Sequence, residues 1–188
     1  ERIPTEDKYL WGKRDCRASG GSYSAWSVGA GDTILDCGVN YPTKVQAWMV
    51  YGPFSLADAA AAEWSFDWWS DTPGGEEDTD RFFWGASING RDFGGYAVPG
   101  NQSSWTTDQI LDLSNVPYVG NLIGEDEAWI AFLFVSDLDM TDRGSFVDNV
   151  LLRKYVGGGA PTEGRLSAPR RPSQTDQKRE AAAFVLDH

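Results

Sequence analysis

The segment Trp64-Ser65-Phe66-Asp67-Trp68 decides the fold, because its aromatic and polar residues alternate without interruption. In an extended strand successive side chains point to opposite faces, so the aromatic rings share one face and the polar groups share the other. The same period of two recurs in residues 81–87 (RFFWGAS), and residues 147–152 (VDNVLL) form a further strand-like segment. These segments predict strands that each bury one face.

Working outward from this segment, residues 128–135 (AWIAFLFV) are apolar throughout, which predicts a central strand covered on both faces. Residues 47–50 (AWMV) predict another strand, closed by Gly52-Pro53, and Asn89-Gly90 predicts a tight hairpin. Residues 56–63 (LADAAAAE) predict a helix of about two turns. Short strands separated by Gly, Pro and Asn predict an all-β fold, an antiparallel β-sandwich or jelly roll.

The composition of the 188-residue chain excludes several classes of function. A net charge of -12 disfavours binding to nucleic acid, whose phosphates select basic surfaces. Two Cys and one His are too few for a zinc cluster. No apolar run approaches the roughly 20 residues that cross a bilayer as a helix, so no membrane span is expected.

The composition also divides the chain into three parts. Residues 1–156 are rich in aromatic side chains and acidic groups, which predicts a compact β-sandwich domain. Residues 157–180 are polar and rich in Gly and Pro, which predicts a linker that buries too little surface to fold. Residues 181–188 begin with AAAFVL, an apolar segment with strand or short-helix potential.

Five segments carry a resemblance to a known family: residues 51–59 (YGPFSLADA), 64–69 (WSFDWW), 82–90 (FFWGASING), 128–137 (AWIAFLFVSD) and 144–154 (GSFVDNVLLRK). Together they resemble the MAM-like and galactose-binding-like jelly-roll modules that accompany catalytic domains in secreted bacterial proteases. The resemblance covers about residues 11–154 and implies a β-sandwich at the cell surface or in the extracellular medium. Members of such families are mostly non-catalytic, and several related jelly rolls hold a structural calcium ion.

Cys16 and Cys37 flank a loop rich in Gly and Ser. In a secreted module an even pair of cysteines predicts a disulfide bond, whereas in the cytosol the same pair would be two free thiols. The implied secretion favours the disulfide.

The acidic residues suggest a metal site. Asp148-Asn149 resembles the terminal-strand position that binds calcium in related jelly rolls, and the nearby acidic loop contributes Asp137 and Asp139. The alternative is that Asp148 accepts hydrogen bonds from backbone N–H groups of a loop. The acidic loop 76–80 is interpreted as a solvated rim.

Catalysis is not expected, because the only His is the C-terminal residue and the usual nucleophile–base pairs lack their base. Sugar binding is the stronger alternative, since tryptophan faces stack on sugar rings. Trp69 follows Trp68 and is expected to point outward if Trp68 lies in the core; Trp105 lies between Ser104 and Thr106 and is a second candidate.

The apolar C-terminal segment suggests assembly. Ala182, Phe184, Val185 and Leu186 are expected to form a strand that completes a sheet edge in a neighbouring copy, head to tail, rather than a disordered end. The sequence therefore predicts a secreted, non-enzymatic module that polymerises into a filament or surface polymer. The alternatives are a carbohydrate- or cell-surface-binding module and a protease accessory domain.

Overall fold

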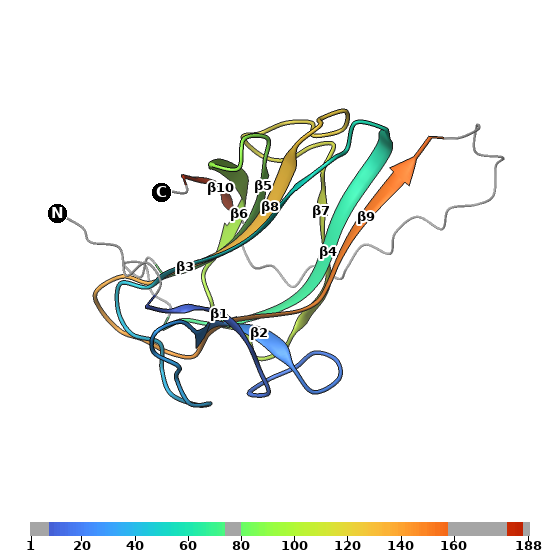
Figure 1. Cartoon of the computed structure of the whole chain (residues 1–188). Coiled ribbons are helices and arrows are strands. Elements are labelled where there is room, and N and C mark those ends of the chain that lie inside the picture. The colour runs from blue at the N-terminus through green and yellow to red at the C-terminus, as the bar shows by residue number, and fades with distance from the viewer. Residues whose placement is uncertain (1–7, 74–79, 158–179, 186–188) are drawn as a thin grey trace.

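The computed structural model describes residues 8–73, 80–157 and 180–185, and within these ranges the regular structure consists of antiparallel strands in two sheets (Figure 1). The first sheet has the order β1-β2-β9-β4-β7, with bounds β1 Leu10–Arg14, β2 Ser24–Ala30, β9 Gly144–Val156, β4 Ala59–Asp71 and β7 Thr106–Asp112. The second has the order β10-β6-β5-β8-β3, with bounds β10 Glu180–Val185, β6 Asp92–Val98, β5 Arg81–Ser87, β8 Ala128–Val135 and β3 Gln46–Phe54. The predicted antiparallel β-sandwich is confirmed.

The core between the sheets is built from the aromatic rows that the alternation predicted. Trp64, Phe66 and Trp68 of β4 are buried in one cluster with Phe82, Trp84 and Phe132 from the opposite sheet. The rings of Phe66 and Phe132 meet edge to face with centroids 4.8 Å apart. Such ring pairs add to the free energy gained by removing the aromatic surface from water.

Strand β8 is covered on both faces, as its continuous apolar sequence predicted. Ile130 and Phe132 point into the core between the sheets. Ala131 and Leu133 belong to a separate cluster on the outer face of the second sheet, which β10 helps to cover. The second sheet therefore has apolar side chains on both of its faces.

Two local predictions concern residues 56–63 and the turn at Asn89-Gly90. The helix predicted over residues 56–63 is wrong: β4 begins at Ala59, and Ala62 and Glu63 pair with Lys154 and Arg153 of β9. Eight residues form a marginal helix, and pairing with β9 gives residues 59–63 backbone partners in the sheet instead. The hairpin predicted at Asn89-Gly90 joins β5 to β6, and Gly90 has the positive φ that this tight turn requires.

Several predicted segments fall partly outside the described residues. Of the predicted linker 157–180, residues 158–179 lie outside them, and so do Glu76, Glu77 and Asp78 of the acidic loop. No helix long and apolar enough to span a bilayer occurs in the part of the chain that the structure describes.

Candidate functional site

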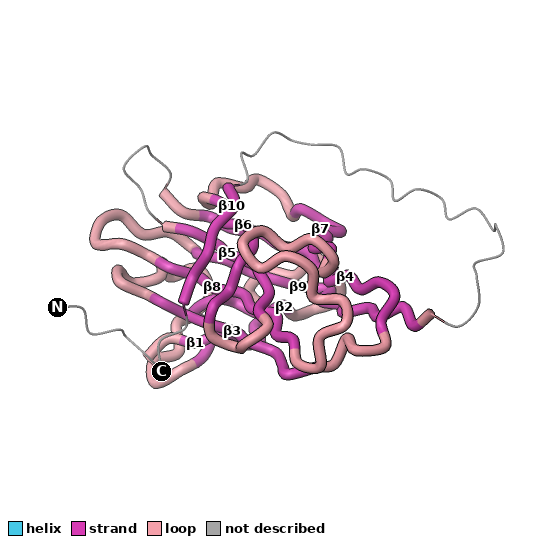
Figure 2. The backbone as a smooth tube through the Cα atoms, turned by 90° about the horizontal axis from the view of Figure 1, so that it is seen from above, coloured by secondary structure: helices cyan, strands magenta, loops and turns pink. Residues whose placement is uncertain are grey.

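The C-terminal strand β10 lies against β6 at the edge of the second sheet, seen from two directions in Figures 1 and 2. The two strands are antiparallel and in continuous register, from Glu180 opposite Ala97 to Val185 opposite Asp92. The pairing thus joins the far end of the chain to the folded domain through a row of backbone contacts.

The side chains of β10 alternate in exposure. Ala182 and Phe184 are half-buried and pack on the outer cluster of the second sheet, whereas Ala181 and Ala183 are exposed. The Phe184 ring meets Phe83 of β5 edge to face, with centroids 4.8 Å apart. Phe184 is therefore the residue that anchors β10 by its side chain.

The apolar segment predicted at the C-terminus does form a strand. Its acceptor in this structure is β6 of the same chain, whereas the sequence predicted the edge of a neighbouring copy. Val185 belongs to the strand through its backbone, and Leu186 lies outside the described residues.

The predicted metal residue Asp148 is held by backbone N–H groups. Its Oδ2 accepts hydrogen bonds from the N–H groups of Ser19 and Gly20, at 2.8 and 3.0 Å, and its Oδ1 accepts one from Asn149 at 2.8 Å. The structure therefore agrees with the alternative interpretation, in which this carboxylate organises a loop. Donors aimed at both oxygens compete with a cation for the same lone pairs.

A second carboxylate, Asp67, lies directly opposite Asp148 on the paired strand β4. Its Oδ2 accepts from Ser19 Oγ at 2.6 Å and from Asn149 Nδ2 at 2.7 Å, and its Oδ1 accepts from the Asp108 N–H at 2.9 Å. Asp67 is buried. Sequence analysis placed Asp67 only on the polar face of its strand, because its partners come from segments distant in sequence.

The other two predicted metal ligands lie in the loop between β8 and β9. The backbone N–H of Asp137 donates to Asp80 Oδ1 at 2.6 Å, and the N–H of Asp139 donates to Asp137 Oδ1 at 2.9 Å. Within the described ranges, Asp137, Asp139 and Asp148 are not close enough together to share one ion. These three carboxylates therefore do not form one cluster, and calcium binding at Asp148 and Asn149 stays a prediction.

The predicted sugar-stacking face at Trp69 is also wrong, because this side chain is only 3% exposed. Trp69 does point away from Trp68, into a second core cluster, but the Arg17 guanidinium lies 3.6 Å from the centre of its ring system and covers it. Trp105 is half-buried against the same cluster, and stacking there stays a prediction.

The predicted disulfide joins Cys16 to Cys37, with Cα atoms 5.2 Å apart. It ties the segment after β1 to the loop between β2 and β3. Arg14 adds a second tie, because its Nη1 donates to the Leu35 carbonyl oxygen at 2.6 Å. Asp15 lies close to both sulfur atoms, but these are bonded to each other, so the group does not form a thiolate metal site.

Charged groups cluster near Trp69. Burial raises the pKa of the Asp71 carboxyl, and the negative charge of Asp142 raises it further, against a smaller opposing effect of Arg143. Burial also lowers the pKa of Arg17, and the like charge of Arg143 adds to this. Both shifts show that this end of the sandwich keeps charges partly out of water.

A cavity of about 470 Å³ opens into the core between β3 and β9. Its lining is almost wholly apolar: Ala25, Met49, Tyr51, Trp64, Ile130, Phe132, Val147, Val150 and Leu152. Sequence analysis missed it. The sequence of β9 held a hint of it. A half-buried strand needs apolar side chains on one face only, but β9 also has them on the other face, among Val150, Leu151, Tyr155 and Val156.

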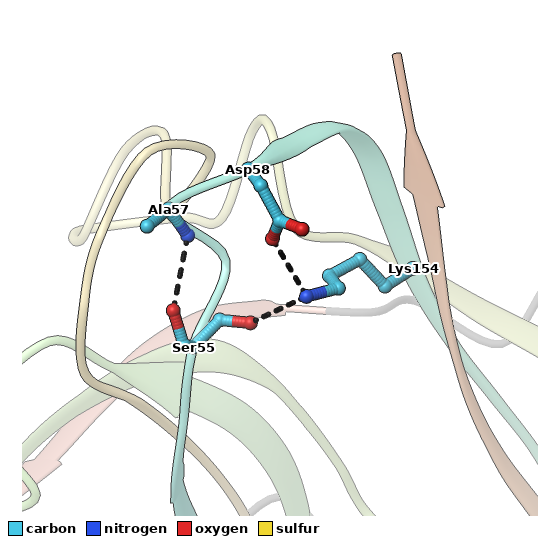
Figure 3. A network of polar contacts seen from close by, with 4 residues as sticks. All are labelled: Ser55, Ala57, Asp58 and Lys154. Atoms are coloured by element: carbon cyan, nitrogen blue, oxygen red, sulfur yellow. Dashed lines mark hydrogen bonds and ion pairs between the residues drawn. The ribbon is translucent and has the colours of Figure 1, made fainter. Parts of the chain in front are cut away.

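Figure 3 shows a polar network between the loop that precedes β4 and Lys154 of β9. Lys154, two residues beyond Leu152, donates from Nζ to Asp58 Oδ1 at 2.7 Å and to the Ser55 carbonyl oxygen at 3.4 Å. Trp11 Nε1 donates to the Ala47 carbonyl oxygen at 2.9 Å and so links β1 of the first sheet to β3 of the second.

The chain matches no protein-family model and no curated protein.

Proposed function

We propose that this chain is an extracellular, non-enzymatic structural module that assembles head to tail through its C-terminal strand. The pairing of β10 along β6 is the observation that carries the proposal, because it demonstrates that residues 180–185 act as an added edge strand. An added strand binds through backbone hydrogen bonds and alternate side-chain contacts, and neither requires that the acceptor edge belong to the same chain.

The connection between the domain and β10 permits such an exchange. Twenty-two residues, 158–179, separate Gly157 from Glu180. At about 3.3 Å per residue this length can span up to roughly 70 Å, several times the ~15 Å radius of gyration of a domain of this size. Because donor and acceptor are different surfaces, the contact propagates from copy to copy as a ring or a filament.

Release of β10 does not disturb the core between the sheets. Its side-chain contacts are to the outer cluster of the second sheet, while Trp64, Phe66, Phe132 and their neighbours form a separate cluster. The extracellular location is supported by the disulfide between Cys16 and Cys37, since such bonds persist in oxidising compartments.

The test is sedimentation velocity of the full chain beside a variant that lacks residues 181–188, at several protein concentrations. We expect concentration-dependent oligomers from the full chain and a folded monomer from the truncated chain. Phe184→Asp should also yield monomers, because it places a charge at the anchoring position. Ala183→Asp is the matched control: Ala183 is the neighbouring residue, and its side chain is exposed.

If the truncated chain assembles as well as the full chain, the proposal is wrong. The carbohydrate-binding alternative then becomes the better one, and a glycan array with the Trp105→Ala variant as its control tests it directly.

A further inference from the structure

Strand β9 has a long edge that no other strand of the described ranges pairs with. It pairs with β4 from Gly144 to Val156, but β2 reaches only Phe146 and Val147 on its other side. Among the strands that the structure describes, none lies beside residues 149–156 on that edge. Unpaired edges of this length are ready templates for another strand.

The same part of β9 exposes apolar side chains on both faces. Val150, which lines the cavity, is 50% exposed, and Leu151, on the opposite face, is 44% exposed. Tyr155 is 50% exposed as well. Beside the apolar cavity, these side chains are the surface that an added strand would bury.

The cavity lies directly beside this edge. Val150 and Leu152 of β9 form one wall, Met49 and Tyr51 of β3 form the other, and Trp64 lies within. A strand paired with β9 beyond the end of β2 would direct every second side chain into the cavity. The edge and the cavity together fit an extended chain better than a compact small molecule, which would leave the backbone edge unpaired.

We infer that this β9 groove, formed by the free edge of residues 149–156 and the adjoining cavity, is the acceptor for the C-terminal strand of a second copy. The inference rests on the proposed assembly and names its binding surface. The donor has the required pattern, with Ala182 and Phe184 on one face of the strand. Gly157 follows β9 directly, and the 22 residues between it and Glu180 are long enough for β10 to reach another copy.

Two other occupants fit less well. A second copy of β9, paired antiparallel about its middle, would bring Arg153 and Lys154 of both copies close together, and like charges across strands repel. Exchange of β10 onto β6 of a neighbour would reproduce the contacts that β10 already makes within its own chain. The intramolecular contact has an effective concentration on the order of millimolar, so exchange without new contacts does not drive assembly in dilute solution.

A donor strand would bury more of its apolar side chains in the β9 groove than β10 buries on β6. On β6 one face of β10 remains exposed, at Ala181 and Ala183, and Phe184 is only half-buried. In the groove the alternate side chains would lie between two sheets, against Trp64, Ile130 and Phe132. The intramolecular pairing with β6 is then the resting position of a donor strand that binds more tightly in trans.

The test compares Val150→Asp with Leu151→Asp in the full chain by sedimentation velocity. The two residues are adjacent and similarly exposed, but only Val150 lines the cavity. We expect Val150→Asp to lose oligomers and Leu151→Asp to keep them, with thermal melting showing that both remain folded. If both variants assemble like the parent chain while deletion of residues 181–188 abolishes assembly, the groove is not the acceptor, but the proposed function stands.

Cross-linking decides the case even if Val150→Asp fails to fold. A mixture of Val150→Cys and Ala182→Cys single variants should form an intermolecular disulfide under oxidising conditions. A mixture of Asp92→Cys and Val185→Cys, which are directly opposite in the β10–β6 register, should form little. The reverse result, with cross-links only between positions 92 and 185 of different copies, would overturn the inference in favour of exchange onto β6.

Discussion

At the scale of single residues, the pair of facing carboxylates at Asp67 and Asp148 organises three segments. Together they bind Ser19 and Gly20 after β1, Asp108 at the start of β7 and Asn149 on β9. Asn149 and Asp108 both have positive φ, at 50° and 54°, which Asn and Asp tolerate better than most residues. Hydrogen bonds to the carboxylates hold the backbone in these uncommon conformations.

Replacing Asp148 by Ala should lower the free energy of unfolding by about 1–3 kcal/mol, because the N–H groups of Ser19, Gly20 and Asn149 lose their acceptor. Urea unfolding measures the difference, and Asp139→Ala in the exposed β8–β9 loop is the control, with a change below about 0.5 kcal/mol.

Calcium binding at Asp148 stays a prediction. If a chelator lowers the melting temperature of the parent chain but not of Asp148→Ala, a metal acts there as well.

The raised pKa of Asp71 gives a pH-dependent prediction. A carboxyl whose pKa is higher in the folded chain favours folding in its protonated form, so its ionisation costs stability as the pH rises through that folded pKa. Asp71→Asn should therefore be more stable than the parent chain at pH 7, by less than about 1 kcal/mol because the group is partly solvated. This advantage should vanish below the ordinary Asp value of 3.8.

The effect of pH on stability through Asp58 should have the opposite sign to the effect through Asp71. The hydrogen bond from Lys154 lowers the pKa of its carboxyl, so its contribution to stability is present above the ordinary value of 3.8 and is lost as the pH falls through the lower folded value. Asp58→Asn should be slightly less stable than the parent chain at pH 7 and equal to it in strong acid. Unfolding curves of Asp71→Asn and Asp58→Asn between pH 2 and pH 7 test both predictions. If the stabilities of the two variants relative to the parent chain change with pH in the same direction, the opposite signs are wrong.

At the scale of elements, the disulfide fixes a segment that the sheets alone do not hold. Residues 15–23 connect β1 to β2 and place Arg17 over Trp69, so the bond between Cys16 and Cys37 helps to cover the second core cluster. This segment lies at the end of the sandwich and contributes no strand of the core.

Replacing both cysteines by Ser should lower the free energy of unfolding by roughly 3 kcal/mol, the value expected from closing a loop of about this length, without abolishing the fold. Thermal melting with near-ultraviolet circular dichroism measures both the loss and the retained packing of the tryptophans. A variant that is unfolded at 25 °C would show that the second cluster depends on the disulfide for its formation.

At the scale of the whole molecule, β10 extends the second sheet at its edge, and its Ala182 and Phe184 side chains pack on the outer face of that sheet. Phe184 contacts Phe83 and lies opposite Phe93 in the register, and Trp48 packs against both of these rings. The domain thus has two apolar surfaces that a donor strand can contact: the outer cluster beside β6 and the cavity beside β9.

Deleting residues 181–188 should leave the sandwich folded but lower the free energy of unfolding by about 1–3 kcal/mol, because Phe184 and Ala182 no longer cover this face. Urea unfolding at a low protein concentration measures the loss, with Ala183→Asp as the control that retains the anchor. An unchanged stability would indicate that β10 does not pair with β6 in the monomer.

The alternation of apolar and polar residues predicted the sandwich, the continuous apolar run of residues 128–135 predicted a central strand at β8, and Asn89-Gly90 predicted the hairpin. These features follow from local rules, because side-chain direction in a strand and the φ requirement of a turn act over a few residues. The disulfide was also predictable, since only two cysteines are present and they had one way to pair. The apolar C-terminal segment was also visible in the sequence, because its residues 181–186 follow a long polar segment.

The tertiary structure alone decided the start of β4, the covering of Trp69, the separation of Asp137 from Asp148 and the position of β10. Each depends on segments far apart in sequence: β9 turns an alanine-rich segment into a strand, and Arg17 reaches a tryptophan about 50 residues away. The cavity beside β9 arises where β2 ends before β9 does, a difference in strand length that only the assembled sheet reveals. Local propensities are weak compared with such long-range contacts, so pairing and burial determined the functional surface.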